Sequence, residues 1–333
     1  MRLLKLFASV LFLIVIFYLI GPQPKAPIYN NQLPIIPAST SELEKYIAAS
    51  ESTHQIKQNN EARIIWANDS LKQKTKYAIV YLHGFSASQE EGNPVHRAIA
   101  KEFGCNLFLA RLSQHGIDTT DALINMTADN LWESAKEAFA IGKQLGDTVL
   151  LMGTSTGGTL ALMLAAAYPE TGGLILYSPN IEINDPNAWL LNNPWGLQIA
   201  RLVKESSYIT TEKNFPEYNN NWNHIYRLES VVQLQEMLET SMLPTTFKKI
   251  TQPTLLLYYF KDDQHQDPVV KVSAMKNMFE TINTSKEKKR MIPVPNAGGH
   301  VLASPIVSKD INTVQLQTSL FLKEIYHLPT MHQ

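Results

Sequence analysis

Residues 149–158 have the sequence VLLMGTSTGG, which is the clearest indication of the fold in this chain. Its apolar beginning predicts a buried strand, and the Ala- and Leu-rich residues that follow predict a helix. Glycines at 153 and 157 permit a sharp strand-to-helix turn that holds Ser155 exposed, with the helix N-terminus supporting nearby negative charge. The pattern G-x-S-x-G also arises by chance in turns, but the strand before it and the helix after it favour a nucleophilic serine.

Short β-rich runs alternate with helical segments on both sides of this turn. This alternation is typical of a mostly parallel sheet covered by helices, an α/β fold. Helices are expected at 94–103, from about residue 127 to 145, and at 159–168. The expected strands are Ala78–Leu82, Asn106–Ala110, Thr148–Met152, Leu174–Tyr177, Thr254–Phe260 and Arg290–Val294.

The connection between Tyr177 and Thr254 is too long for a simple crossover, so we expect an insertion at about 180–250. It is rich in Asn and aromatic residues and includes an amphipathic helix that begins near Leu228. Most of the aromatic side chains are expected to pack the insertion on the sheet, and a few to reach a ligand pocket.

His300 is the best candidate for a base that activates Ser155. It follows the last expected strand, two glycines precede it, and its place near the C-terminus fits the chain order serine, acid, histidine. An ordinary loop histidine is the alternative. His83 and His115, which follow earlier strands, are expected to stabilise loops.

Two backbone amides are candidates for an oxyanion hole. One is expected from the loop 81–88 (YLHGFSAS), at Phe85, and the other is the amide of Thr156, next to Ser155.

Several carboxylates compete to be the acid that orients His300. Asp267 precedes Pro-Val-Val, which can begin the next helix, whereas Asp263 lies nearer the strand end; we prefer Asp267. Asp263, His265 and Asp267 alternate and could face one way as a metal site, a less favoured alternative because no further ligand cluster accompanies them.

Composition excludes several other classes of protein. The chain has 333 residues, 44% apolar and 18% charged, and is therefore able to bury a large core. Its net charge of -1 leaves no electrostatic footprint for nucleic acid. The single cysteine, Cys105, excludes an internal disulfide framework and cysteine-based zinc sites.

The N-terminal residues 1–22 resemble a targeting segment. Leu6 to Ile20 are mostly apolar, Arg2 and Lys5 precede them, and prolines follow. We expect an uncleaved membrane anchor in preference to a cleaved signal peptide, since no A-x-A-like site precedes the prolines. The positive flank places the rest of the chain on the non-cytoplasmic side, or outside the cell if the segment is cleaved.

Residues 23–60 are expected to form a proline-rich, extended tether up to Pro37 and then a short helix at 39–50, capped by Ser39, Thr40 or Ser41. The folded domain is expected at 61–330.

With these motifs the sequence resembles the α/β-hydrolase superfamily, and within it the lysophospholipase and monoacylglycerol-lipase-like serine esterases. The resemblance covers about residues 76–326 and is carried by HGF at 83–85, RLSQHG at 111–116, GTSTG at 153–157, DPVV at 267–270 and GH at 299–300. It implies an eight-stranded sheet, a lid inserted after the sixth strand, a triad of Ser155, Asp267 and His300, and no cofactor or metal.

The expected activity is cleavage of carboxyl esters, such as acyl-glycerols, lysophospholipids or small esters, without a protein partner. Thioesterase, peptidase and haloperoxidase chemistry use the same residues, and a non-catalytic binding protein could keep the scaffold. Serine at 155, where a haloalkane dehalogenase would carry aspartate, argues against that reaction. Gln114 replaces a glycine usual in the family, and the loop that carries Asp267 is longer than usual.

Overall fold

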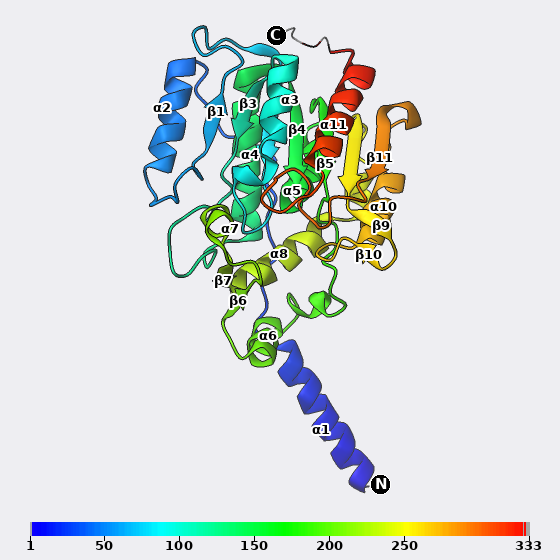
Figure 1. Ribbon diagram of the computed structural model, residues 1–333. Helices are drawn as coiled ribbons and strands as arrows, with labels where there is room; N and C mark the ends of the chain where they lie inside the picture. The colour runs from blue at the N-terminus through cyan, green and yellow to red at the C-terminus, as the bar shows by residue number, and fades with distance from the viewer. Residues whose placement is uncertain (1, 329, 331–333) are drawn as a thin grey trace.

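A seven-stranded sheet forms the centre of the protein in a computed structural model that describes residues 2–328 and 330 (Figure 1). The strand order is β1-β3-β2-β4-β5-β8-β11, parallel throughout except that β1 pairs antiparallel with β3. The strands are β1 (Arg63–Ile65), β2 (Thr75–Leu82), β3 (Asn106–Leu109), β4 (Gly146–Thr154), β5 (Gly173–Tyr177), β8 (Thr254–Tyr258) and β11 (Lys289–Pro293).

The predicted α/β fold is confirmed, and each expected strand overlaps one of the sheet strands. The expected number of strands is wrong: the described residues form seven strands in this sheet, not eight. The described chain before β1 forms two helices and an extended segment in place of a further strand. The short edge strand β1 was not predicted, because three half-buried residues give too little apolar alternation to read.

Helices cover both faces of the sheet. On one face pack α2 (Thr40–Glu51), α4 (Ala128–Leu145), α5 (Thr156–Ala167) and α10 (Val272–Thr281), and on the other α3 (Val95–Phe103) and α11 (Ile311–Tyr326). Alternate residues of β2 divide between the two cores: Ala78 and Val80 face the first, whereas Ile79 and Tyr81 face the second. Two-sided burial explains why these strands are continuous apolar runs.

Local sequence signals set the ends of the helices. The Thr127 side chain accepts a hydrogen bond from the Asn130 N–H and the Asn130 side chain accepts one from the Thr127 N–H, a capping box that begins α4. Of the three predicted cap candidates, Ser39 is the one that caps α2, where its side chain accepts a hydrogen bond from the Glu42 N–H. Gly104 ends α3 with a φ of 61°, in the left-handed region that glycine adopts without strain.

The predicted insertion lies between β5 and β8 and gathers at one end of the sheet (Figure 1). Because β5 is the fifth strand of the sheet in chain order, the insertion follows the fifth strand and not the sixth. It contains η2 (Ala188–Leu190), α6 (Gly196–Lys204), the hairpin of β6 (Tyr208–Thr210) and β7 (Ile225–Arg227), α7 (Pro216–Asn221), α8 (Leu228–Ser241) and α9 (Pro244–Phe247).

The proline-rich segment is extended, as expected, but the expectation that it is unpacked is wrong. Residues 22–37 contain no helix or strand and lie against α4 and the end of α5. Their backbone oxygens accept hydrogen bonds from three side chains: Trp132 Nε1 to Asn30, Tyr168 Oη to Asn31 and Lys136 Nζ to Gln32. A segment outside helices and strands leaves its backbone carbonyls unpaired, so these carbonyls are free to accept hydrogen bonds from the helices.

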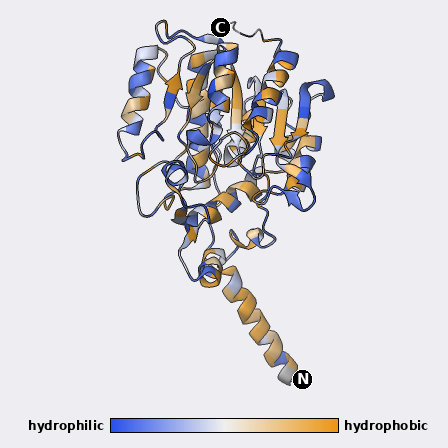
Figure 2. Ribbon diagram, viewed as in Figure 1, coloured by the Kyte–Doolittle hydropathy of each residue, from blue (hydrophilic) through white to orange (hydrophobic). Residues whose placement is uncertain are grey.

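The apolar N-terminal run forms α1 (Arg2–Leu19), which projects from the molecule beside α6 (Figures 1 and 2). Phe17 stacks on Trp195 with ring centroids 4.8 Å apart. Within the part of the chain that the structure describes, no helix combines the length and the apolar character needed to cross a membrane. The expected transmembrane anchor is therefore not supported.

Candidate active site

Ser155 occupies the turn between β4 and α5 in a strained backbone conformation, with φ 53° and ψ −119°. Its N–H donates to the Tyr177 carbonyl and its carbonyl accepts from the Asn180 N–H, so the end of the neighbouring strand β5 and the loop after it hold the turn. A Cβ atom at Gly157 would lie 1.9 Å from the Leu82 oxygen, which explains the glycine there. Strain of this kind costs about 1–3 kcal/mol and is typical of functional sites.

Asp267 and His300 form a buried pair beyond the ends of β8 and β11. His300 Nδ1 lies 2.7 Å from Asp267 Oδ2, and Asp267 is fully buried. Its other oxygen, Oδ1, accepts the N–H groups of Val269 and Val270 at 2.9 and 3.1 Å. The carboxylate is thus fixed by its own backbone, and it points at the imidazole.

The pair perturbs both pKa values. Burial lowers the pKa of His300, but the charge and hydrogen bond of Asp267, with the charge of Glu91, outweigh burial and raise it above its ordinary 6.5. Burial raises the pKa of Asp267, but His300 and the two amides more than offset this and hold it below 3.8. Asp267 is therefore ionised at neutral pH and accepts the proton on Nδ1, which leaves Nε2 of neutral His300 as a base.

The competing carboxylate, Asp263, does not reach His300. It lies on the exposed turn between β9 (Phe260–Asp262) and β10 (His265–Gln266), a hairpin that accounts for the unusual length of the loop. His265 is also exposed and pairs with Asp262 at 2.8 Å. Asp263, His265 and Asp267 therefore do not converge, and no group of metal-ligating side chains occurs among the residues the structure describes.

The loop after β2 presents the first of the two expected oxyanion donors. His83 Nδ1 donates to the Gly84 carbonyl at 2.9 Å, and His83 Nε2 accepts the Leu112 N–H at 3.0 Å. Burial and the nearby His115 hold the pKa of His83 well below 6.5, so the ring is neutral with its proton on Nδ1. His83 acts as a loop histidine, and His115 does too, through its 2.9 Å contact to the Ser113 carbonyl.

The carbonyl of Gly84 and the N–H of Phe85 belong to one planar peptide and point in opposite directions. By fixing the carbonyl, His83 also fixes the direction of the Phe85 N–H. The second expected donor, the Thr156 N–H, opens α5, where the first amides of a helix have no partner within the helix.

The insertion packs on the loop after β2, which carries Phe85. The N–H of Asn223 donates to the Ser86 carbonyl at 2.8 Å. Tyr218 and Trp222 stack with ring centroids 4.9 Å apart and pack on Ala87, and Val301, next to His300, packs against the same cluster. Contrary to the expectation of an exposed serine, Ser155 is only 6% exposed. As expected, most of the insertion's aromatic residues pack on the protein, although Trp189 and Phe215 are exposed.

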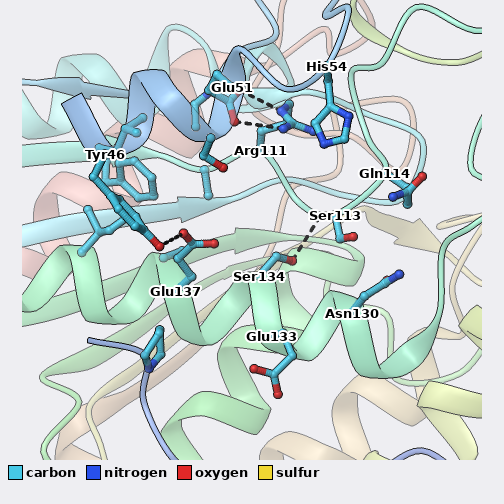
Figure 3. A pocket seen from close by; sticks show the side chains of 18 residues that line it. Tyr46, Glu51, His54, Arg111, Ser113, Gln114, Asn130, Glu133, Ser134 and Glu137 are labelled. Atoms are coloured by element: carbon cyan, nitrogen blue, oxygen red, sulfur yellow. Dashed lines mark hydrogen bonds and ion pairs between the residues drawn. The ribbon is translucent and has the colours of Figure 1, made fainter. Parts of the chain in front are cut away.

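The cavity of about 390 Å³ between α2 and α4 is a different place (Figure 3). Arg111 makes a bidentate pair with Glu51, and the Tyr46 hydroxyl donates to Glu137. These polar groups are paired with one another, and none of them belongs to the Ser155 site. The cavity is therefore separate from the candidate active site.

Sequence reasoning missed Glu91 and the residues of the insertion that contact the Ser155 site. Glu91 is buried beneath the loop after β2, but its neighbour Glu90 has the same side chain, and nothing in the local pattern separates the two. Trp222 is one of many aromatic residues in the insertion, and only the fold brings it to Ala87.

A serine on a strained turn at the carboxyl edge of a parallel sheet, with an acid and a histidine after later strands, is the arrangement of the α/β-hydrolase fold. Residues 128–300, over half of the chain, match the family described as serine aminopeptidase, S33. The chain belongs to this family of α/β-hydrolases.

Individual relatives agree with this assignment. A thermostable monoacylglycerol lipase of Bacillus sp. (strain H-257) is 31% identical over 106 residues, which is 32% of this chain. The match spans 41% of the length of that lipase.

Two solved structures are similar in fold. One is from a study of LipS and LipT, two metagenome-derived lipolytic enzymes (TM-score 0.63, 16% identity, 81% of this chain and 99% of that chain). The other is Est1E from Butyrivibrio proteoclasticus with ferulic acid bound (TM-score 0.55, 16% identity, covering 80% of this chain and 95% of that chain).

Proposed function

We propose that the protein is a serine hydrolase that cleaves carboxyl esters through an acyl-enzyme, with Ser155 as nucleophile, His300 as general base and Asp267 as the orienting acid. The observation that carries the proposal is the state of His300. Its Nδ1 is committed to Asp267, whereas its Nε2 is buried without a hydrogen-bond partner among the described residues. A buried nitrogen without a partner is costly unless a ligand or a reacting group uses it.

The reaction proceeds in two halves. His300 Nε2 takes the proton of Ser155 as Oγ attacks the ester carbonyl, and the tetrahedral intermediate collapses with loss of the alcohol, which receives that proton. Water then attacks the acyl-enzyme and gives a proton to Nε2. Ser155 Oγ leaves and takes this proton back, which regenerates the free enzyme.

The N–H groups of Phe85 and Thr156 would bind the negative oxygen that forms in each half. Removing one such donor typically costs about 10²–10³-fold in kcat. Asp267 keeps the imidazole in the tautomer that leaves Nε2 free and stabilises the imidazolium that forms on it.

The substrates we propose are acyl-glycerols, lysophospholipids or small carboxyl esters. Support comes from the aromatic residues Tyr218 and Trp222 of the insertion, which pack on Ala87 of the oxyanion loop, and from the name of the matched Bacillus protein, a monoacylglycerol lipase. We further propose that the domain works on the non-cytoplasmic side, because Arg2 and Lys5 followed by an apolar run resemble a secretory targeting segment. Fractionation of cells that express the full chain tests this; recovery in the cytoplasm would contradict it.

The test is to assay the purified full chain on p-nitrophenyl esters of graded length, monoacylglycerols and lysophospholipids. We expect Ser155→Ala to lower kcat by roughly 10⁴-fold or more without loss of thermal stability. The matched control is Ser319→Ala on α11, whose hydroxyl bonds Glu102 away from the site. Ester turnover retained by Ser155→Ala would refute the proposal.

A second candidate follows from the family description, which names an aminopeptidase. Amino-acid p-nitroanilides, and thioesters for the thioesterase alternative, belong in the same assay; faster cleavage of either would replace the ester assignment. A fluorophosphonate probe separates all of these from a binding protein, because only an activated Ser155 is labelled.

A further inference from the structure

Glu91 is a buried carboxylate that the reaction scheme above does not use. It belongs to η1 (Gln89–Gly92), the short 3₁₀ turn that follows the oxyanion loop, and it is only 2% exposed. It makes no ion pair with lysine, arginine or histidine within the described residues. Burying a carboxylate without a counter-ion lowers the stability of the fold, which suggests that Glu91 has a role at this position.

The carboxylate contacts the backbone of the oxyanion loop directly. The Gly84 N–H donates to Glu91 Oε2 at 2.5 Å. A Cβ atom at position 84 would lie 2.8 and 2.9 Å from the two carboxylate oxygens. Only glycine at 84 therefore lets the acid approach so closely.

Glycine also makes this loop flexible, since it has the widest choice of backbone angles. Two side chains remove that freedom. Glu91 holds the Gly84 N–H, which fixes the peptide between residues 83 and 84, and His83 holds the Gly84 carbonyl, which fixes the peptide between 84 and 85. The second peptide carries the Phe85 N–H, the proposed oxyanion donor.

Glu91 is itself held in place from several sides. The His96 ring contacts the Gln89 carbonyl at 2.9 Å and so ties η1 to α3. Burial raises the pKa of Glu91 to about 7, while the Gly84 amide, His300, Trp222 and Tyr81 act in the opposite direction. These groups surround the carboxylate from β2, the insertion and the loop that carries His300.

We propose that Glu91 is a positioning residue for the oxyanion hole: its carboxylate accepts the Gly84 N–H and thereby holds the Gly84–Phe85 turn in the conformation that presents the Phe85 amide to the reacting oxygen. This inference rests on the proposed ester hydrolysis. In this role Glu91 acts as a hydrogen-bond acceptor placed within reach of the Gly84 N–H. A negative charge that did not reach this N–H would not hold the turn.

Three substitutions at this position separate the acceptor from the charge. Glu91→Gln keeps an acceptor oxygen at the same distance and removes the charge; Glu91→Asp keeps the charge and withdraws the oxygen by one methylene; Glu91→Ala removes both. We expect kcat on a p-nitrophenyl ester to fall about 10²–10³-fold in Glu91→Ala and Glu91→Asp, and less than about tenfold in Glu91→Gln, with KM within about threefold throughout. If Glu91→Ala does not fold, Glu91→Asp and Glu91→Gln alone decide the question.

A second readout reports on the hole itself. Affinity for a trifluoromethyl ketone, which forms a tetrahedral oxyanion on Ser155, should fall in parallel with kcat in Glu91→Asp and stay near the native value in Glu91→Gln. The matched control is Glu102→Ala, which removes a carboxylate that joins α3 to α11 through Ser319 and Lys323 and should leave kcat unchanged.

The results also distinguish this inference from the proposed function. Native-like kcat in folded Glu91→Asp, or a larger loss in Glu91→Gln than in Glu91→Asp, would overturn the role of Glu91 while Ser155→Ala still lacks activity. Full turnover by Ser155→Ala would instead remove the function on which the inference rests.

Discussion

The Asp267 carboxylate lies 2.7 Å from Nδ1 of His300, and its second oxygen is bound by the amides of Val269 and Val270. The orientation of the acid is therefore set by its own loop, independently of the histidine. Proline at 268, which cannot donate a backbone N–H, leaves these two later amides to hold the carboxylate.

Replacing Asp267 by Asn should lower kcat for ester cleavage by roughly 10⁴-fold, because an amide facing Nδ1 favours the tautomer that carries its proton on Nε2. Asp263→Asn is the control, since Asp263 is exposed on the β9–β10 turn, and kcat should change less than about twofold. Steady-state kinetics on one activated ester measure both. Equal losses in the two variants would show that Asp267 is not the acid.

The pH profile should follow His300, which accepts a proton only when neutral. Because the pKa of His300 is raised above 6.5, kcat/KM should rise with pH through that raised value and then level off. In Asp267→Asn the main cause that raises the pKa is gone, so the acidic limb should move to lower pH. A limb that stays in place, or moves to higher pH, would contradict the assignment.

The same pair should stabilise the fold in a defined pH window. The contribution of Asp267, whose pKa is lowered, is present above 3.8 and is lost as pH falls through the lowered value. The contribution of His300, whose pKa is raised, is present below 6.5 and is lost as pH rises through the raised value. The Tm difference between the native protein and Asp267→Asn should therefore be largest between pH 3.8 and 6.5 and shrink on either side.

Gly157→Ala should destabilise the protein by at least about 1–3 kcal/mol and abolish ester cleavage, because the new Cβ meets the Leu82 oxygen at 1.9 Å and forces α5 away from β2. Gly299→Ala is the matched control, since an added Cβ there has no atom within 4 Å. Chemical denaturation gives both free energies of unfolding. A native-like Gly157→Ala protein would show that the turn is not as tight as described.

Tyr168→Phe should cost about 1 kcal/mol and loosen residues 22–37, because it removes the hydroxyl that donates to the Asn31 carbonyl at 2.9 Å. Trypsin should then cut faster after Lys25, with ester cleavage unchanged. Tyr326→Phe loses a hydroxyl that donates to the Gly172 carbonyl at the same 2.9 Å. It should show a similar loss of stability without faster cleavage at Lys25; equal cleavage in both variants would mean that general stability, and not this contact, controls the segment.

The class of fold, and Ser155 as the candidate nucleophile, could be predicted from the sequence alone. Strand, glycine-flanked turn and helix at 149–158 are local features, and local features depend on backbone sterics and short-range hydrophobic periodicity, which a linear sequence displays. For the same reason the α/β alternation, and the beginnings of the helices near residues 39 and 127, could be predicted in advance.

Only the tertiary structure decided which carboxylate faces His300, how Glu91 meets Gly84, and that residues 22–37 lie packed on α4 and α5. In each case the partners are brought together by the fold. Along the chain, the Pro-Val-Val after Asp267 gives only a preference over Asp263, and nothing separates Glu90 from Glu91. Whether a carboxylate is buried and which hydrogen-bond donor it meets depend on the packing of distant elements, so this information is absent from local pattern and appears only when the sheet and its helices assemble.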